Sequence, residues 1–131
     1  TNTTNPQTLH VRIFDNNTGN LEIALLTLEV VFSPLIPVLN DIIECDVNAD
    51  GLATFNLSSI ETQVIDENPN IDIIVTYYNS QADADSGLNL IDAASFANID
   101  NTSQTIFVRA ENLVTNCYST SSVNLVVDSS C

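Results

Sequence analysis

The sequence predicts an all-β fold, an Ig-like antiparallel β-sandwich repeat module with one short helical turn. Three observations lead to this prediction. Apolar and polar residues alternate over several short segments, clusters of Asn, Asp, Gly and Ser separate these segments, and the chain repeats itself internally. With 131 residues and an apolar share of 44%, the chain is long enough for one sandwich domain of about 100 residues and a remainder.

The expected strands follow from the period of two that half-buried strands show. One alternating segment runs from Thr8 to Phe14, and a similar one runs from Thr105 to Glu111. The other expected strands are Leu21 to Phe32, Ile42 to Cys45, Ala53 to Leu57, Ile71 to Tyr78, Leu88 to Ile91 and Ser122 to Val127. Their spacing is typical of a sandwich.

One helical signal interrupts the strands. Ser58 followed by Glu61 forms a capping-box pattern ahead of apolar residues at helical spacing, and Asn68-Pro69 would end the helix. We expect a helix of one or two turns that covers one end of the sandwich.

The internal repeat has an offset of 97 residues and needs no gap. The only two basic residues, Arg12 and Arg109, occupy the same place in the two copies. The other matches are Gln7-Thr8 with Gln104-Thr105, Val11 with Val108, Thr18 with Thr115, Leu28 with Leu125 and Val30 with Val127.

This repeat predicts that the chain is a phase-shifted slice of a tandem array. Residues 1–34 would be the C-terminal strands of a preceding repeat, and residues 39–131 would be the following Ig-like repeat. Residues 35–38 would be a Pro-containing linker, and Pro34 and Pro37 favour a semi-rigid junction.

The charge balance limits the classes of partner. Seventeen Asp and Glu residues face two Arg, which gives a net charge of -15. Such a field repels phosphate backbones and anionic lipids, so we expect no nucleic-acid partner, and the lack of a long apolar stretch predicts no membrane insertion. The charge favours cation binding. It is equally well explained as a means of keeping a crowded surface protein soluble.

Catalysis is not expected from this sequence. The chain has one His, no Trp and no nucleophile motif, and carboxylate pairs arise by chance when so many are present. Cys45, Cys117 and Cys131 lack the close spacing of a zinc or redox site. The sequence therefore predicts neither catalytic residues nor an organic cofactor.

A set of segments carries a resemblance to known proteins. The segments are Glu44–Gly51, Phe55–Leu57, Val75–Tyr78, Ala82–Asp85, Gln104–Arg109 and Thr115–Cys117. Together they resemble a repeat of giant cell-surface adhesins of Bacteroidetes, including those linked to gliding motility and exported by the type IX secretion system. The resemblance implies an extracellular structural or adhesive module at the cell surface, but it does not identify what is adhered to.

The resemblance also bears on the cysteines. In such a repeat the cysteine after Glu44 and the one after the turn are expected in the same module, which fits a disulfide between Cys45 and Cys117. An exported protein would form that bond readily, and its loop of about 70 residues would contribute roughly 4 kcal/mol. Cys131 would be left over in the next linker, and Asn20 stands where the second unit has Cys117.

The first candidate metal site is the segment with Asp46, Asn48 and Asp50. It matches the first half of an EF-hand loop, in which side-chain oxygens at alternate positions bind Ca²⁺. The twelfth position is Leu57 rather than Glu, so the segment is not an EF-hand. Calcium in a different cage is one interpretation, and a metal-free, Asx-rich turn is the other.

The second and weaker candidate metal site is a short acidic loop with Asp83 and Asp85. Most such loops are simply solvated, and the same argument for Ca²⁺ applies to this one with less force.

Three functional hypotheses remain open. In the first, tandem modules stiffen a long fibre, so that the partners are neighbouring repeats of the same chain or filament. In the second, each repeat binds surface glycans or proteins, for which Tyr78 and the acidic loops give the support. In the third, the chain is a subunit of a self-assembling extracellular fibre in which a partial repeat takes up strands from a neighbouring chain.

Overall fold

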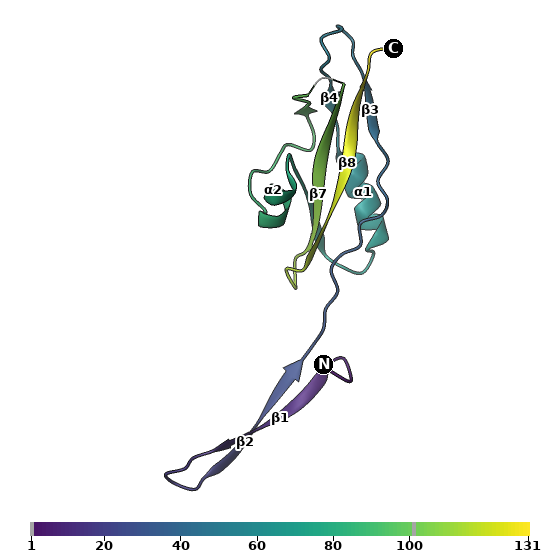
Figure 1. The fold of residues 1–131 in the computed structure, drawn as a ribbon. Coiled ribbons are helices and arrows are strands. Elements are labelled where there is room, and N and C mark those ends of the chain that lie inside the picture. The colour runs from purple at the N-terminus through teal and green to yellow at the C-terminus, as the bar shows by residue number, and fades with distance from the viewer. Residues whose placement is uncertain (1, 101) are drawn as a thin grey trace. The chain divides into compact units, whose positions relative to one another are not determined.

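The computed structural model describes residues 2–100 and 102–131 and divides the chain into two compact units. Unit 1 ends at Phe32 and unit 2 spans Ser33–Cys131. Unit 1 contains β1 (Gln7–Phe14) and β2 (Leu21–Leu28) (Figure 1). Unit 2 contains β3 (Ile42–Cys45), β4 (Thr54–Phe55), α1 (Ser58–Glu67), β5 (Ile73–Tyr78), α2 (Gln81–Ser86), β6 (Phe96–Ala97), β7 (Ser103–Asn112) and β8 (Tyr118–Asp128).

Unit 2 is built on a four-stranded sheet with the order β3-β8-β7-β5. The long strands β7 and β8 form its centre and pair antiparallel, and β5 pairs antiparallel with β7. The edge strand β3 runs parallel to β8. The short strands β4 and β6 pair with each other in a separate ribbon.

The core of unit 2 lies between this sheet and a second layer made by β4, β6 and α1. Apolar side chains from both layers are buried there. The sheet contributes Val75, Tyr77, Ile106, Val108, Ala110, Val123, Leu125 and Val127, and the second layer contributes Phe55, Leu57, Ile60, Val64 and Phe96. The prediction of an all-β, sandwich-like fold with a short helix is confirmed, although the module has two helices.

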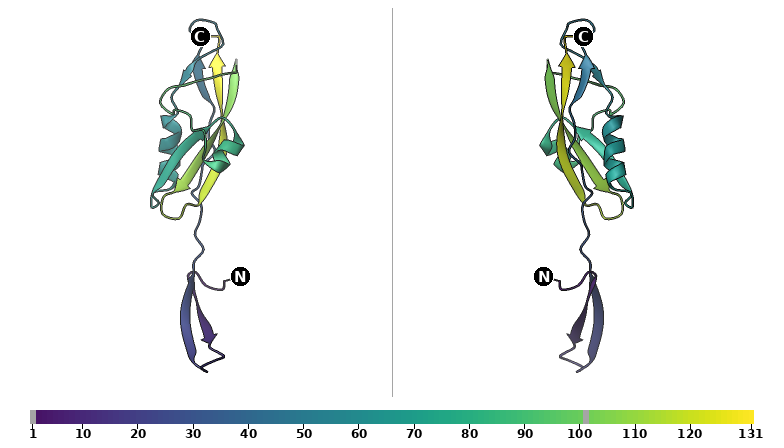
Figure 2. Two further views of the ribbon diagram at one scale, coloured as in Figure 1. Left: turned by 90° about the vertical axis from the view of Figure 1, so that its left-hand side faces the viewer. Right: turned by 90° about the vertical axis from the view of Figure 1, so that its right-hand side faces the viewer.

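The two helices lie on opposite faces of the sheet (Figure 2). This arrangement explains why the adjacent residues Tyr77 and Tyr78 are both 2% exposed, although their side chains alternate across β5. Tyr77 faces the core, where its hydroxyl donates to the Leu57 carbonyl at 3.1 Å, and burial raises the pKa of Tyr77. Tyr78 lies on the α2 side and donates to Thr76 Oγ1 at 3.0 Å.

Helix α1 is longer than the predicted one or two turns and begins differently. The N-cap is Leu57, which makes no side-chain cap bond, and Ser58 is the first helical residue, so the predicted capping box is wrong. The Ser58 N–H is instead bound by Asn56 Oδ1 at 2.9 Å. Asn68 is the C-cap, at the predicted end of the helix. Its amide group donates to the carbonyls of Val64 and Leu35 and accepts from the Leu35 N–H, all within 2.9 Å, and so ties the segment that precedes β3 to the helix.

Two short elements were not predicted, and one predicted strand is absent. The expected acidic loop with Asp83 and Asp85 is helix α2, and β6 is a two-residue strand that is too short to show a period. The expected strand from Leu88 to Ile91 has no regular structure, and only the Ile91 N–H bonds to a strand neighbour, the Tyr77 carbonyl.

Unit 1 is a hairpin whose pairing is that of β7 and β8. Gln7 lies opposite Leu28, and Gln104 lies opposite Leu125, so that each partner is 97 residues from its counterpart. The same offset places all the remaining residue pairs of the β1–β2 hairpin on residue pairs of the β7–β8 hairpin. The sequence repeat is therefore also a structural repeat.

The turns that close the two hairpins use the same hydrogen bonds. Asp15 and Asn112 each accept with Oδ1 the N–H groups two and three residues ahead, at 2.8–3.3 Å. The Gly19 N–H donates to the Asp15 carbonyl, and the Asn116 N–H donates to the Asn112 carbonyl, both at 2.8 Å. Gly19 and Asn116 have positive φ angles of 74° and 57°. Glycine and asparagine are the residues that tolerate this left-handed conformation best.

The matched positions differ in burial. On one face of the β7–β8 hairpin, six apolar positions are at most 7% exposed, whereas their counterparts in unit 1 are 38–52% exposed. The pairs are Leu9 and Ile106, Val11 and Val108, Ile13 and Ala110, Leu26 and Val123, Leu28 and Leu125, and Val30 and Val127.

This contrast predicts unequal effects of one substitution at two matched leucines. Leu125→Ala should lower the free energy of unfolding of unit 2 by about 2–5 kcal/mol, because it removes buried methyl groups and leaves a cavity. Leu28→Ala should cost less than about 1 kcal/mol, because Leu28 is already 39% exposed. Urea denaturation of both variants measures the difference, and equal losses would contradict the burial described above.

Candidate functional site

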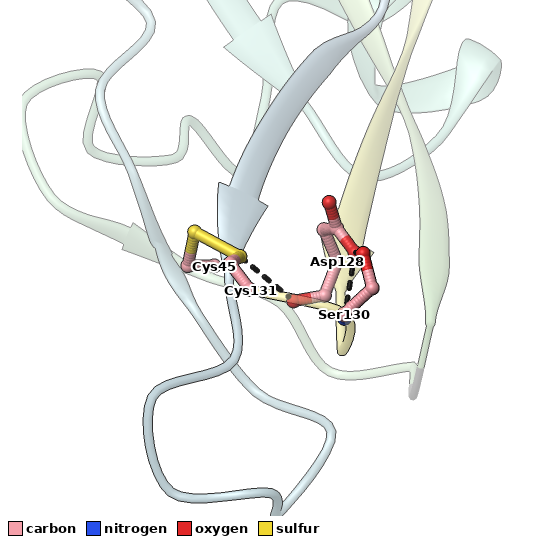
Figure 3. Close-up of a disulfide and its surroundings, with 4 residues drawn as sticks. All are labelled: Cys45, Asp128, Ser130 and Cys131. Carbon is pink, nitrogen blue, oxygen red and sulfur yellow. Dashed lines mark hydrogen bonds between the residues drawn. A yellow bond between two sulfur atoms is a disulfide. The ribbon is translucent and has the colours of Figure 1, made fainter.

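The candidate site is the disulfide-bonded end of unit 2. Cys45 is the last residue of β3, and its register partner on β8 is Asp128. The chain turns after β8, and Cys131 forms a disulfide with Cys45 across a Cα–Cα distance of 5.9 Å (Figure 3). The bond therefore fastens the four-residue edge strand β3 to the residues that follow β8.

The predicted disulfide between Cys45 and Cys117 is wrong, and Cys117 is a free thiol. Cys45 lies beside Asp128, whereas Cys117 precedes Tyr118 at the other end of the eleven-residue strand β8. At about 3.3 Å per residue, the two cysteines are roughly 35 Å apart, which is far beyond disulfide reach. Cys131 does not lie in a following linker, as predicted. It follows β8, the strand that pairs with β3, and therefore lies close to Cys45.

A short hydrogen-bonded turn presents Cys131 to Cys45. The Asp128 carboxylate accepts from the Ser130 hydroxyl at 2.6 Å and from the Ser130 N–H at 2.8 Å (Figure 3). These bonds lower the pKa of Asp128, because they favour its charged form. The Asp46 N–H donates to the Asp128 carbonyl at 2.9 Å and extends the β3–β8 pairing by one bond.

The predicted metal loop adjoins the disulfide, and its side chains bond mainly to the loop itself. The two oxygens of Asp46 accept from the N–H groups of Asp50 and Gly51 at 3.2 and 2.8 Å. Asp50 accepts from the Leu52 N–H and from the Asn48 amide, both at 2.8 Å. This is the Asx-rich turn that the second sequence interpretation described.

The described residues contain no group of three or more His, Cys, Asp or Glu that could hold a metal ion. Asp46 and Asp50 still have unused lone pairs, since an ionised carboxylate accepts about four hydrogen bonds. A calcium ion here would need amide, main-chain or water oxygens to complete its six to eight ligands. Calcium binding at Asp46, Asn48 and Asp50 therefore stays a prediction.

Asp83 and Asp85, the weaker metal candidates, act within α2. Ser80 caps the helix by accepting from the Asp83 N–H at 3.1 Å and donates in return to the Asp83 carboxylate at 2.6 Å. This bond and a second one from Asn89 lower the pKa of Asp83. Asp85 accepts from the Gln81 amide at 2.8 Å. The structure gives both carboxylates local partners.

Arg109 joins α2 to the sheet, and sequence analysis assigned it no such role. Its guanidinium donates to the carbonyls of Ala84 and Asp85 at 2.8 and 3.0 Å, where a helix C-terminus carries partial negative charge. It also forms the one ion pair among residues 2–100 and 102–131, with Glu111 at 2.6 Å, and lies 3.5 Å from the centroid of the Tyr118 ring. The repetition of the two arginines was the only signal in the sequence.

One family model matches residues 41–130, and its description is the Flavobacterium inter-domain disulphide bond domain. This range lies entirely within unit 2 and stops one residue short of Cys131. The genus name agrees with the predicted Bacteroidetes resemblance. No curated protein and no solved structure matches the chain.

The disulfide indicates an oxidising compartment, as is typical of extracellular proteins. Within the part of the chain that the structure describes, no helix is long and apolar enough to cross a membrane.

Loss of the disulfide should destabilise unit 2. The bond joins residues separated by 86 positions, and in the chain-entropy model removing it by Cys131→Ser costs about 4–5 kcal/mol. Cys117→Ser is the matched control and should leave stability nearly unchanged, since Cys117 is free. Denaturation without reductant measures both variants. A larger loss for Cys117→Ser, or peptide mapping that links Cys117 to Cys45, would contradict the bond described here.

Calcium should raise the melting temperature if the predicted loop binds it. Binding only to the folded state would add about 2.7 kcal/mol at a hundred times the dissociation constant. Melts in millimolar CaCl₂ are compared with NaCl and MgCl₂ at equal ionic strength, for wild type and for Asp50→Ala. An unchanged melting temperature relative to the salt controls, or a shift that survives Asp50→Ala, would show that this loop does not bind calcium.

The Ser80–Asp83 cap should give a pH-dependent contribution to stability. The pKa of Asp83 is lowered in the folded chain, so the contribution is present above its unfolded value of 3.8 and is lost as the pH falls through the folded value. Ser80→Ala should therefore destabilise unit 2 more at pH 7 than at pH 3. Taking the difference from wild type at each pH cancels the general charge effect, and equal differences at both values would contradict this role.

Proposed function

The chain belongs to the Flavobacterium inter-domain disulphide bond domain family, and we propose that it is a non-catalytic structural module of a long, multi-domain extracellular protein at the cell surface. The family match covers unit 2, and the all-β fold with a disulfide and a packed core is typical of such modules.

The observation that carries the proposal is the repeated hairpin. Two copies with the same register and the same turn bonds, 97 residues apart, are what a tandem array of one fold produces. In such an array each module mainly contacts its neighbours, and the partners are adjacent repeats of the same chain or filament. The resemblance to surface adhesins of gliding, type IX-secreting bacteria adds a setting in surface attachment.

The family description also gives a role to the disulfide. Both cysteines lie in unit 2, and Cys131 follows the turn after β8, so its bond with Cys45 fastens this end of the unit to the β3 edge. A disulfide in this place would restrain whatever follows β8 against the β3 edge. We assign to it the stiffening of a junction between domains.

Glycan or protein binding by each repeat is less well supported. Tyr78 was the aromatic residue on which this alternative rested, and it is 2% exposed, so its ring is not available to stack on a sugar. Self-assembly through a partial repeat concerns unit 1 alone and does not alter the proposed function of unit 2.

Scattering from proteins with increasing numbers of the 97-residue repeat tests the proposal. The maximum dimension should grow by a constant step per repeat, of at least the length of β8, about 36 Å for eleven residues. Reduction of the disulfide should broaden the distribution of dimensions. A particle whose dimension grows only as the cube root of its mass would overturn the stalk function.

A further inference from the structure

The β1–β2 hairpin of unit 1 lacks, among the described residues, the partners that surround the β7–β8 hairpin of unit 2. In unit 2, β7 and β8 are flanked on both edges, by an antiparallel strand beside β7 and a parallel strand beside β8. In unit 1, β1 and β2 form a sheet of two strands only. Both outer edges of this hairpin therefore carry main-chain groups without strand partners in the part of the chain described.

The exposed core-facing positions of unit 1 are those that unit 2 buries. Because the register and the turn are the same, Val11 stands where Val108 is fully buried, and Leu28 stands where Leu125 is fully buried. An apolar face of this kind is expected to be covered, since strands with one buried face alternate in the way that β1 does.

The opposite face of the hairpin also lacks its cover. In unit 2 this face holds Arg109, which is 9% exposed because α2 ends on it. Its counterpart Arg12 is exposed. Beside Arg12, the positions of Thr120 and Ser122 are taken by Ile23 and Leu25, which are 65% and 66% exposed. This face is thus more apolar than its counterpart and is suited to being covered.

We infer that the hairpin is a docking surface for one occupant, a segment with the fold of residues 38–100 of unit 2. That segment would add an antiparallel strand beside β1, a parallel strand beside β2 and an apolar layer over Val11 and Leu28. On the other face it would place the C-terminal carbonyls of a short helix on Arg12. Arg12 suits this occupant, because the equivalent segment of unit 2 contains no basic residue that would repel it; the hairpin also carries Asp15, Glu22 and Glu29, so its net charge adds no argument.

A second copy of this hairpin is a poorer occupant. Two hairpins packed face to face would cover one apolar face but would leave all four outer edges unpaired and Arg12 without helix carbonyls. Unit 2 of a second chain is also unsuitable, because its own β7 and β8 already fill the place. The inference rests on the proposed tandem repeat and specifies how the repeat is completed.

The test extends the full chain with its own sequence. A copy of residues 35–98 is fused directly before Asn2, and Cys45 of that copy is replaced by Ser. Each added residue then lies 97 positions before the same residue in unit 2, which is the spacing of the repeat. Hydrogen exchange of the β1 and β2 amides is measured with and without the extension, and the amides of β7 and β8 serve as the internal reference for folding. The extension should slow exchange of the hairpin amides by at least about a hundredfold.

Matched variants identify the faces used. In the extended chain, Val11→Asn should abolish most of the added protection, whereas Thr8→Asn, at a position exposed in both units, should preserve it. Arg12→Gln should lower protection in the first module, as Arg109→Gln should in unit 2, because each would remove the guanidinium that binds the helix carbonyls. In the chain without the extension, Arg12→Gln should change nothing.

Two outcomes would overturn the inference. One is that the hairpin amides exchange as fast with the extension as without it, while the β7 and β8 amides stay protected. The other is that the unextended chain forms a dimer in sedimentation and protects its hairpin amides, which would make a second copy the occupant. A compact multi-repeat particle in scattering would contradict the stalk function and would leave this docking surface intact.

Discussion

Unit 2 depends on one constraint, which is that the β7–β8 hairpin has one face buried in the core, the Arg109 region of its other face covered by α2, and a strand paired along part of each edge. One face forms the core with α1, β4 and β6, and the other face holds Arg109 under α2. Each edge is paired, with β5 on one side and β3 on the other. The apolar face, the Arg109 side and the two edges of this hairpin therefore determine where the other helices and strands of the module lie.

The acidic composition is compatible with this compact fold because many carboxylates accept hydrogen bonds from nearby groups of the same turn. Asp15, Asp46 and Asp128 each bind N–H groups within the next five residues, and Asp83 binds the hydroxyl that caps its helix. These groups lie in turns and at a helix end, away from the core. These bonds lower the pKa of Asp15, Asp83 and Asp128, because they favour the ionised carboxylate.

Sequence reasoning reached the parts of the fold that have a long period or an exact repeat. The alternation of β1 and β7 and the 97-residue offset predicted these strands and their repetition, because such patterns extend over many residues. It did not find β6, whose two residues cannot show a period, or α2, whose Asp83 and Asp85 were interpreted as an acidic loop. The disulfide was mispredicted because pairing depends on which strand ends adjoin, and the parallel placement of β3 beside β8 leaves no local signal.

The parallel placement of β3 has a mechanical consequence. The chain enters unit 2 at Pro34, whose carbonyl accepts from the Ser119 hydroxyl near the start of β8, and it reaches Cys131 just beyond the other end of that strand. A pulling force between these points would pass along residues 34–45 and then across the sulfur atoms. The residues between Cys45 and Cys131 would carry no tension, so even an unfolded module could lengthen only by the straightening of residues 34–45. A disulfide that carries the force in this way would make each module nearly inextensible while the bond is intact.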